Sequence, residues 1–142
     1  MPDEIPTAPF PEPAPTSSGG SGLEPNVAGA LSYLLGALTG IVFLLIDKDR
    51  PFVRFHAVQS IAVSVALVGA WVVVSLVMLV LNVLPIIGTL IGFLLWLALA
   101  VLGFALWIYL MYKAFHGKQW AVPVLAPYVR KYAEQITAGD GQ

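Results

Sequence analysis

The strongest constraint on this chain is a long stretch without charge, because no aspartate, glutamate, lysine or arginine occurs between Phe55 and Tyr112. A transmembrane helix needs about 20 predominantly apolar residues, so this stretch is long enough for at least two. Residues 27–46 form a second uncharged run. With 58% hydrophobic residues, 11% charged residues and a mean hydropathy of +0.85, the composition is that of a membrane protein.

Two breaks divide the apolar sequence into helices. The charged turn "DKDRP" ends at Pro51, whose ring cannot continue a preceding helix. The segment "NVLPIIG", residues 82–88, gathers asparagine, proline and glycine, which are the residues typical of a turn. The sequence therefore predicts an all-α integral membrane bundle of three transmembrane helices within a domain of residues 23–117. The predicted helices span about residues 26–46, 55–84 and 86–115.

The two flanks of this domain differ from it in composition. Residues 1–22 hold six prolines and end in a Ser/Gly run, which predicts a disordered tail. The tail lacks the basic and apolar regions of a signal peptide. Residues 118–142 predict a C-terminal interfacial segment, in which a short amphipathic helix lies on the membrane surface and a tail follows.

The basic residues predict an orientation in the cell (inner) membrane. Three lie in the first loop and four follow the third predicted helix, namely Lys48, Arg50 and Arg54, then Lys113, Lys118, Arg130 and Lys131. By the positive-inside rule, a multi-pass protein with three spans has this loop and its C-terminus in the cytoplasm and its N-terminus outside. A fourth span would break this alternation. The bilayer is thus the first expected partner, with interfacial anchors at Arg50, Arg54, Lys113, Lys118 and Trp120.

One face of the second predicted helix carries most of its hydrogen-bonding side chains. At 100° per residue, the members of this polar face lie close to one another around the helix. Polar groups in hydrocarbon are costly unless paired, so the face should turn toward other helices or a water-filled crevice. The candidate residues are His56, Gln59, Ser60, Ser64, Ser75 and Asn82.

Two GxxxG patterns, "GALTG" and "GTLIG", begin at Gly36 and Gly88. Glycine lets two helix backbones approach closely and gain packing contacts. The predicted helix-packing residues are Gly36, Gly40, Gly88, Gly92 and Gly103. They predict a compact bundle that could also pair with copies of itself.

The sequence offers no reactive constellation. The absence of cysteine excludes disulfides, thiolate catalysis and cysteine metal sites. His56 and His116 are the two histidines, and without a nearby carboxylate they make a poor metal site. Ser60 lies one turn after His56, but only the loop residues Asp47 and Asp49 could orient such a pair. We expect no enzyme activity, no cofactor and no metal, and a net charge of −1 gives no reason to expect nucleic acid.

Three blocks carry a resemblance to a known family. These are the Leu-Ser-Tyr-Leu-Leu-Gly run at 31–36, "FVRFHAVQS" at 52–60 and "GKQWAVPVL" at 117–125. Together they resemble small prokaryotic integral membrane proteins of unknown function, which are grouped with the twenty-kilodalton component of the chloroplast Tic import translocon. The resemblance implies a helical integral membrane protein, and for the plant relatives a role at a protein-import channel. It implies no catalytic residues and no cofactor.

These observations leave functions of different classes open. The first is a non-enzymatic structural or interaction element that associates with itself or with a membrane complex. The second is a channel or protein-translocation subunit, in which the polar face lines a water path. A third, a small-solute transporter, would ordinarily need a charged or repeat-related site at the membrane midplane, and neither is visible.

Overall fold

A computed structural model describes residues 20–139 of the chain, with side chains up to residue 136. Every regular element in this part is a helix, which confirms the predicted all-α class. Most of the predicted disordered tail, residues 1–22, lies outside the described residues, as do residues 140–142. The helices are α1 (Pro25–Leu31), α2 (Ala37–Ile46), α3 (Pro51–Leu81), α4 (Pro85–Phe115) and α5 (Ala126–Gly139).

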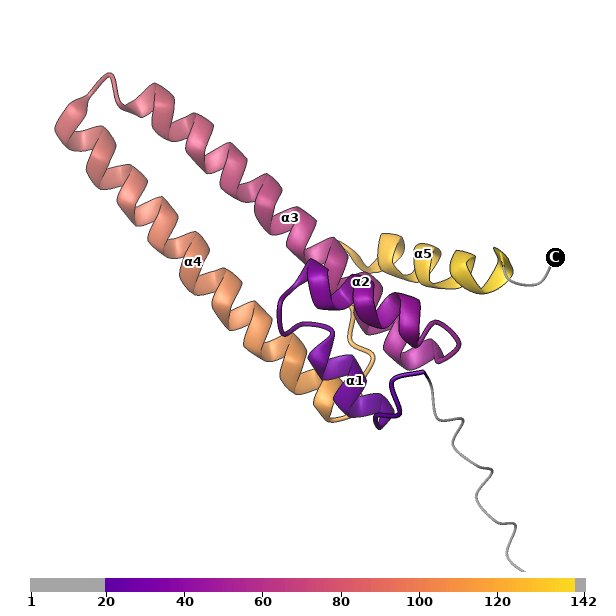
Figure 1. Cartoon of the computed structure of the whole chain (residues 1–142). Coiled ribbons are helices and arrows are strands. Elements are labelled where there is room, and N and C mark those ends of the chain that lie inside the picture. Colours follow the sequence, from indigo (N-terminus) through magenta and orange to yellow (C-terminus); the bar gives the residue numbers. More distant parts are fainter. Residues whose placement is uncertain (1–19, 140–142) are drawn as a thin grey trace, which may run out of the picture.

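Helices α3 and α4 form a long antiparallel hairpin (Figure 1). Each has 31 residues and is therefore about 46 Å long. Each begins with proline in its first turn, where the missing backbone donor costs nothing. The turn between them lies at the predicted "NVLPIIG" break, and α4 ends at the predicted residue. Helix α3 starts four residues earlier than predicted, because Pro51 opens the helix.

The predicted single helix over residues 26–46 is wrong, because the structure divides it into α1 and α2. Gly36 separates them with φ of 61°, a conformation that an α-helix cannot contain. The hydroxyl of Thr39 stabilises this turn by donating to the Ser32 carbonyl (2.9 Å) and accepting from the Leu35 amide (3.2 Å). The apolar side chains of this segment therefore belong to two short helices joined by a turn.

The three predicted spans are not confirmed. Helix α2 has 10 residues and is about 15 Å long, which is half the thickness of a hydrocarbon core of roughly 30 Å. Helix α1, with 7 residues, is shorter still. In the described part of the chain, α3 and α4 are the two helices long and apolar enough to cross a membrane. The prediction of an external N-terminus depended on the third span.

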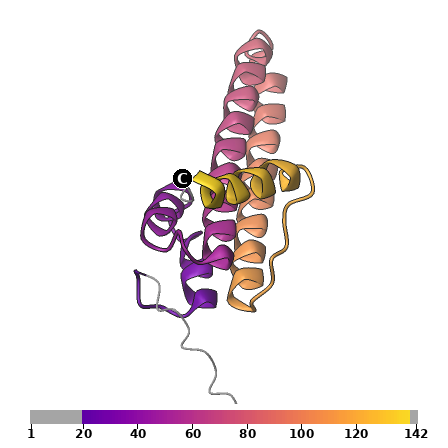
Figure 2. The same ribbon diagram turned by 90° about the vertical axis from the view of Figure 1, so that its right-hand side faces the viewer.

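The three shorter helices gather at the end of the hairpin opposite its turn. We call this the open end. Helix α1 packs against α3 and α4, and α2 packs along α3. Helix α5 lies across the hairpin beside α3 (Figure 2). Its buried residues Val129 and Ala133 pack against Phe55 and Val58 of α3.

Each glycine predicted to pack helices lies against α3 of the same chain. Gly40 of α2 contacts the backbone at Ala57, and Gly92 of α4 lies beside Met78. A side chain at either position would collide with these neighbours. Gly36 and Gly88 likewise leave no room for a side chain, against Ser64 and Leu81, whereas Gly103 lies beside Leu67 at an ordinary contact distance. These small residues therefore hold the bundle together within one chain.

Candidate functional site

The open end of the hairpin contains a cluster of buried polar side chains, which we call the polar core: Tyr33, His56, Gln59 and Ser60. At its centre, a hydrogen bond of 2.9 Å joins Tyr33 Oη to His56 Nδ1. Both side chains are at most 2% exposed. The imidazole is also enclosed by the rings of Phe52 and Phe55, at centroid distances of 4.6 and 5.2 Å. His56 thus fixes the α1–α2 turn to the start of α3.

Gln59 and Ser60 connect the polar core to two further segments. The Gln59 amide donates to the carbonyl of Trp120, in the segment that follows α4 (3.2 Å). The Ser60 hydroxyl donates to the carbonyl of Gly36 (2.9 Å). Each bond therefore pairs a buried polar side chain of α3 with a backbone carbonyl of another segment, which lowers the cost of burying the side chain. The Gly36 carbonyl also accepts from the Gly40 amide (3.0 Å), in the first turn of α2.

Helix α4 joins the same network through Trp107, whose indole N–H donates to the Tyr33 carbonyl (2.6 Å). Three stretches of the sequence therefore meet at one place: the α1–α2 turn, the first turns of α3 and the exit from α4. They are also the three blocks that carry the family resemblance. Tyr33 and Trp107 were not among the predicted site residues, although Tyr33 lies inside the first of those blocks.

The structure divides the predicted polar face of α3. His56, Gln59 and Ser60 are buried in the polar core. Farther along the helix, the hydroxyls of Ser64 and Ser75 donate to the carbonyls of the residues four positions earlier (2.8 and 2.9 Å). Asn82 lies at the end of α3, beside the hairpin turn. A water path along this face stays a prediction.

A second polar cluster, the N-terminal latch, lies beside the start of α3. The Arg50 guanidinium donates to the Asp47 carboxylate, to the Ser21 hydroxyl (2.9 Å) and to the Leu23 carbonyl (2.6 Å). The Ser21 amide and hydroxyl also donate to Asp47. Burial disfavours the Asp47 carboxylate, but the hydrogen bonds from Ser21 and the charge of Arg50 outweigh it and hold its pKa below the ordinary value.

The predicted interfacial anchors fall into two groups. Arg50 and Arg54 are buried at 7% and 8% exposure, and Arg54 donates to the Lys48 carbonyl (2.8 Å), so both arginines stabilise the α2–α3 turn. Lys113 is half-buried and Lys118 is exposed. The Lys113 ammonium lies 5.2 Å from the centroid of the Tyr109 ring. Trp120 packs its edge against the same tyrosine and is half-buried.

The chemistry open to these groups follows from their partners. Ser60 donates to Gly36 and His56 pairs with Tyr33, so these two side chains do not form a nucleophile and base pair. Within residues 20–139, no three histidine, aspartate or glutamate side chains are arranged to hold a metal ion. The polar core thus joins four segments of the chain through hydrogen bonds, while the buried Nε2 of His56 and Oε1 of Gln59 have no hydrogen-bond partner in the structure.

A two-helix hairpin with exposed apolar flanks and a buried polar core at one end defines a small helical membrane protein. Residues 24–129 match the magnetosome magnetite crystal formation protein family, and the chain belongs to this family. The resemblance to small membrane proteins is thereby confirmed, whereas the grouping with the Tic component is not.

Curated relatives agree with this class. A UPF0132 membrane protein of Archaeoglobus fulgidus is 40% identical over 121 residues, covering 82% of this chain and 99% of the relative. A UPF0132 membrane protein of Methanocaldococcus jannaschii is 37% identical over 113 residues, covering 80% and 92%. No solved structure shows a significant match.

Proposed function

We propose that this protein is a non-enzymatic membrane hairpin that serves as a structural or interaction element, with both flanks of the hairpin in the cytoplasm. The observation that carries the orientation is the distribution of charge. All seven lysines and arginines belong to the open end, where α3 begins, α4 ends and α5 packs. The turn, residues 82–84, carries none. The positive-inside rule then directs the open end to the cytoplasm and the turn to the opposite side.

The depth of insertion follows from two independent features. A hydrocarbon core of roughly 30 Å takes about 20 helical residues. Counted from the turn, this length reaches Ile61 in α3 and Ala105 in α4. Helix α5 crosses α3 at the same level, where Val58 and Ala62 pack against it. The level of α5, the helix predicted to lie on the membrane surface, therefore agrees with the level of that surface expected from the length of the hairpin.

The two flanks of α5 support this placement. Arg130 and Glu134 share a shallow pocket with Pro51 and Arg54, so this flank faces the cytoplasmic end of α3. At 100° per residue, the exposed Tyr128 falls on the opposite flank, toward the hairpin turn. Tyr132, one helical turn later, lies beside it. Tyrosine prefers the headgroup level of a bilayer, so both flanks match a helix at the membrane surface.

Cysteine accessibility tests the orientation, because the natural chain has no cysteine. Single variants Glu24→Cys, Val83→Cys and Gln135→Cys place a thiol before α1, at the turn and on α5. With a membrane-impermeant maleimide, we expect Glu24→Cys and Gln135→Cys to react only from the cytoplasmic side and Val83→Cys only from outside. Labelling of Glu24→Cys from outside and of Gln135→Cys from the cytoplasm would restore the three-span arrangement.

The interaction role is supported by the exposed apolar side chains of α2. Leu38 and Leu45 are 68% and 72% exposed, although α2 is too short to span the membrane. In native membranes, a photocrosslinker at Leu38 should yield an adduct with a second copy or another protein. A matched crosslinker at Val101, 59% exposed on α4, measures random encounters. Equal yields at the two positions would contradict a specific association through α2.

A further inference from the structure

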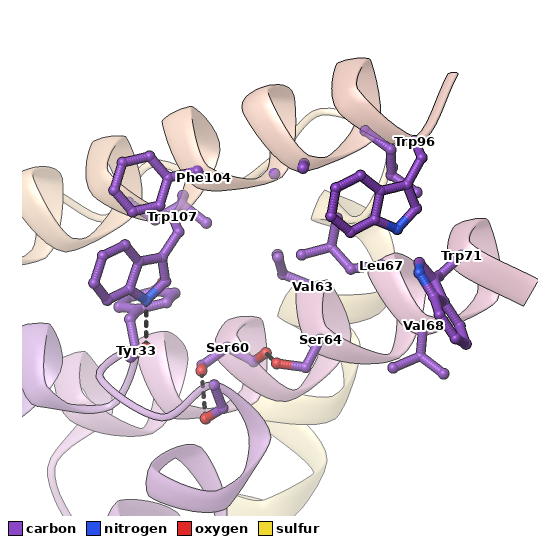
Figure 3. A pocket seen from close by; sticks show the side chains of 15 residues that line it. Tyr33, Ser60, Val63, Ser64, Leu67, Val68, Trp71, Trp96, Phe104 and Trp107 are labelled. Atoms are coloured by element: carbon purple, nitrogen blue, oxygen red, sulfur yellow. Dashed lines mark hydrogen bonds between the residues drawn. The ribbon is translucent and has the colours of Figure 1, made fainter. Parts of the chain in front are cut away.

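A cavity of about 510 Å³ separates α3 from α4 in the half of the hairpin nearer the open end (Figure 3). The two helices meet closely near the turn, where Gly92 lies against Met78. At the other end α1 fills the space between them, and Tyr33 and Leu110 close the cavity. Between these contacts the helices leave a groove, which Trp71 and Trp96 border on the side of the turn.

The lining of this groove favours an apolar ligand. Most of it is aliphatic or aromatic, including Val63, Leu67 and Leu99. Its hydroxyl groups already have partners, since Ser60 donates to the Gly36 carbonyl and Ser64 to the Ser60 carbonyl. A water molecule needs two to four polar partners, so it would be poorly held here. A hydrocarbon chain needs no hydrogen bonds and could fill the same space.

The groove has the depth of one leaflet. From Ser60 to Trp71, α3 rises about 16 Å, while half of a hydrocarbon core is roughly 15 Å. Its end at Ser60 coincides with the level at which α5 crosses α3. The groove therefore runs from the membrane surface on the basic side to the middle of the bilayer.

The groove is open to the side, because Val68 and Phe104 are 63% and 61% exposed although they line it. Its length decides between two apolar occupants. A membrane-spanning helix of a second copy is about 30 Å long and about 10 Å in diameter, so it would run past a groove that extends about 16 Å and meet α1 at one end and the Gly92–Met78 contact at the other. A single hydrocarbon chain is far thinner.

We propose that the groove between α3 and α4 holds one acyl chain of a phospholipid from the leaflet on the basic side. The inference rests on the hairpin insertion proposed above. The bound chain acts as a third packing element between the two helices.

Tryptophan fluorescence tests this occupant, because Trp107 lines the groove and is half-buried. A variant in which the other three tryptophans are replaced by phenylalanine has Trp107 as its single tryptophan. It is reconstituted into phosphatidylcholine and phosphatidylglycerol vesicles whose acyl chains carry bromine, which quenches indole on contact. Ala100→Phe adds a ring inside the groove. Because the ring takes the place of the chain, we expect the quenching of Trp107 to fall by about half.

The matched control is Ala98→Phe, which adds the same ring to α4 outside the groove and should leave the quenching unchanged. Quenching that is insensitive to Ala100→Phe, or equally sensitive to both variants, would overturn the proposal. So would a disulfide between two copies of an Ala100→Cys variant, because a second copy would then occupy the groove.

A separate variant distinguishes failure of the groove from failure of the hairpin. Leu102 is 68% exposed and lies outside the groove. A Leu102→Trp protein without other tryptophans is quenched whenever α4 lies in hydrocarbon. If the Leu102→Trp protein is quenched while the quenching of Trp107 is unchanged by Ala100→Phe, only the acyl-chain site is contradicted. If the Leu102→Trp protein is not quenched, the proposed insertion is contradicted as well.

Discussion

At the scale of single residues, the polar core depends on pairing groups that would be costly alone. Tyr33 and His56 are both buried, and their side chains form a hydrogen bond with each other. Removing one partner leaves the other buried without a hydrogen bond, which costs more than the bond itself contributes. The polar core is therefore more sensitive to truncation than the number of its hydrogen bonds suggests.

Tyr33→Phe tests this sensitivity, because it deletes the hydroxyl and keeps the ring. We expect the free energy of unfolding in detergent micelles to fall by about 1–3 kcal/mol. Tyr112→Phe is the control, since Tyr112 is 58% exposed and should change stability by no more than about 0.5 kcal/mol. Circular dichroism during denaturant titration measures both. A neutral Tyr33→Phe would show that the imidazole finds another partner.

The N-terminal latch should respond to pH through Asp47. Its native pKa lies below the unfolded value of about 3.9, so its contribution to stability is complete above that value and is lost as the pH falls through the native pKa. We expect wild type to be more stable than Asp47→Asn near neutral pH, with the difference shrinking as the pH falls below the unfolded value of about 3.9. Asp49→Asn, at an exposed position of the same turn, is the control and should change stability near neutral pH by no more than about 0.5 kcal/mol. A pH-independent difference would contradict the role of the carboxylate.

At the scale of helices, Gly36 decides how the N-terminal part of the chain is arranged. Its positive φ ends one helix and permits the next to return along α3. A β-carbon at this position would also lie 2.7 Å from the Ser64 hydroxyl. The turn is therefore restricted both by its backbone conformation and by its closeness to α3.

Gly36→Ala should destabilise the protein by about 1–3 kcal/mol, because a side chain is strained in this backbone conformation. Gly69→Ala is the matched control, since Gly69 is helical and has open space where its side chain would be. Alanine is the better helix former, so that variant should be neutral or slightly stabilising. Unfolding of both proteins under the same conditions gives the comparison. Equal effects would mean that the turn tolerates a side chain.

The sequence predicts the long helices better than the short ones, for a physical reason. Proline at residues 51 and 85 marks helix starts, so the hairpin can be located from local signals. The α1–α2 turn lies inside an uncharged run, where Leu34, Leu35 and Gly36 read as part of a membrane helix. The interruption of the helix at this turn is stabilised by hydrogen bonds from Ser60 and Trp107, which are distant in sequence. The polar face was likewise predicted from periodicity, whereas the partners that divide it lie on other elements.

At the scale of the whole molecule, the separation of charge is the feature with most consequence for insertion. The open end carries every lysine and arginine, and the turn is uncharged. Asn82 is the one polar residue of that turn, and Val83 is 82% exposed. In the proposed orientation, only a short uncharged segment has to cross the hydrocarbon during insertion.

Val83→Arg should therefore reduce the fraction of protein that inserts, since arginine costs about 3 kcal/mol at the centre of a membrane helix and less toward the interface. Val124→Arg is the control, because Val124 is equally exposed, at 80%, but lies at the basic end. The amount of each variant that resists alkaline extraction from membranes measures insertion. Equal retention of the two variants would show that the turn need not cross.

The polar core also implies an order of folding. Its bonds join residues 23, 61 and 74 positions apart, and the last partner to be synthesised is Trp120. The hairpin can close through contacts near its turn as soon as α4 exists, since those contacts are local. The α1–α2 segment, although made first, has no complete binding place until α4 has emerged, because Trp107 of α4 donates to the Tyr33 carbonyl. We infer that the earliest part of the described chain is among the last to reach its final position.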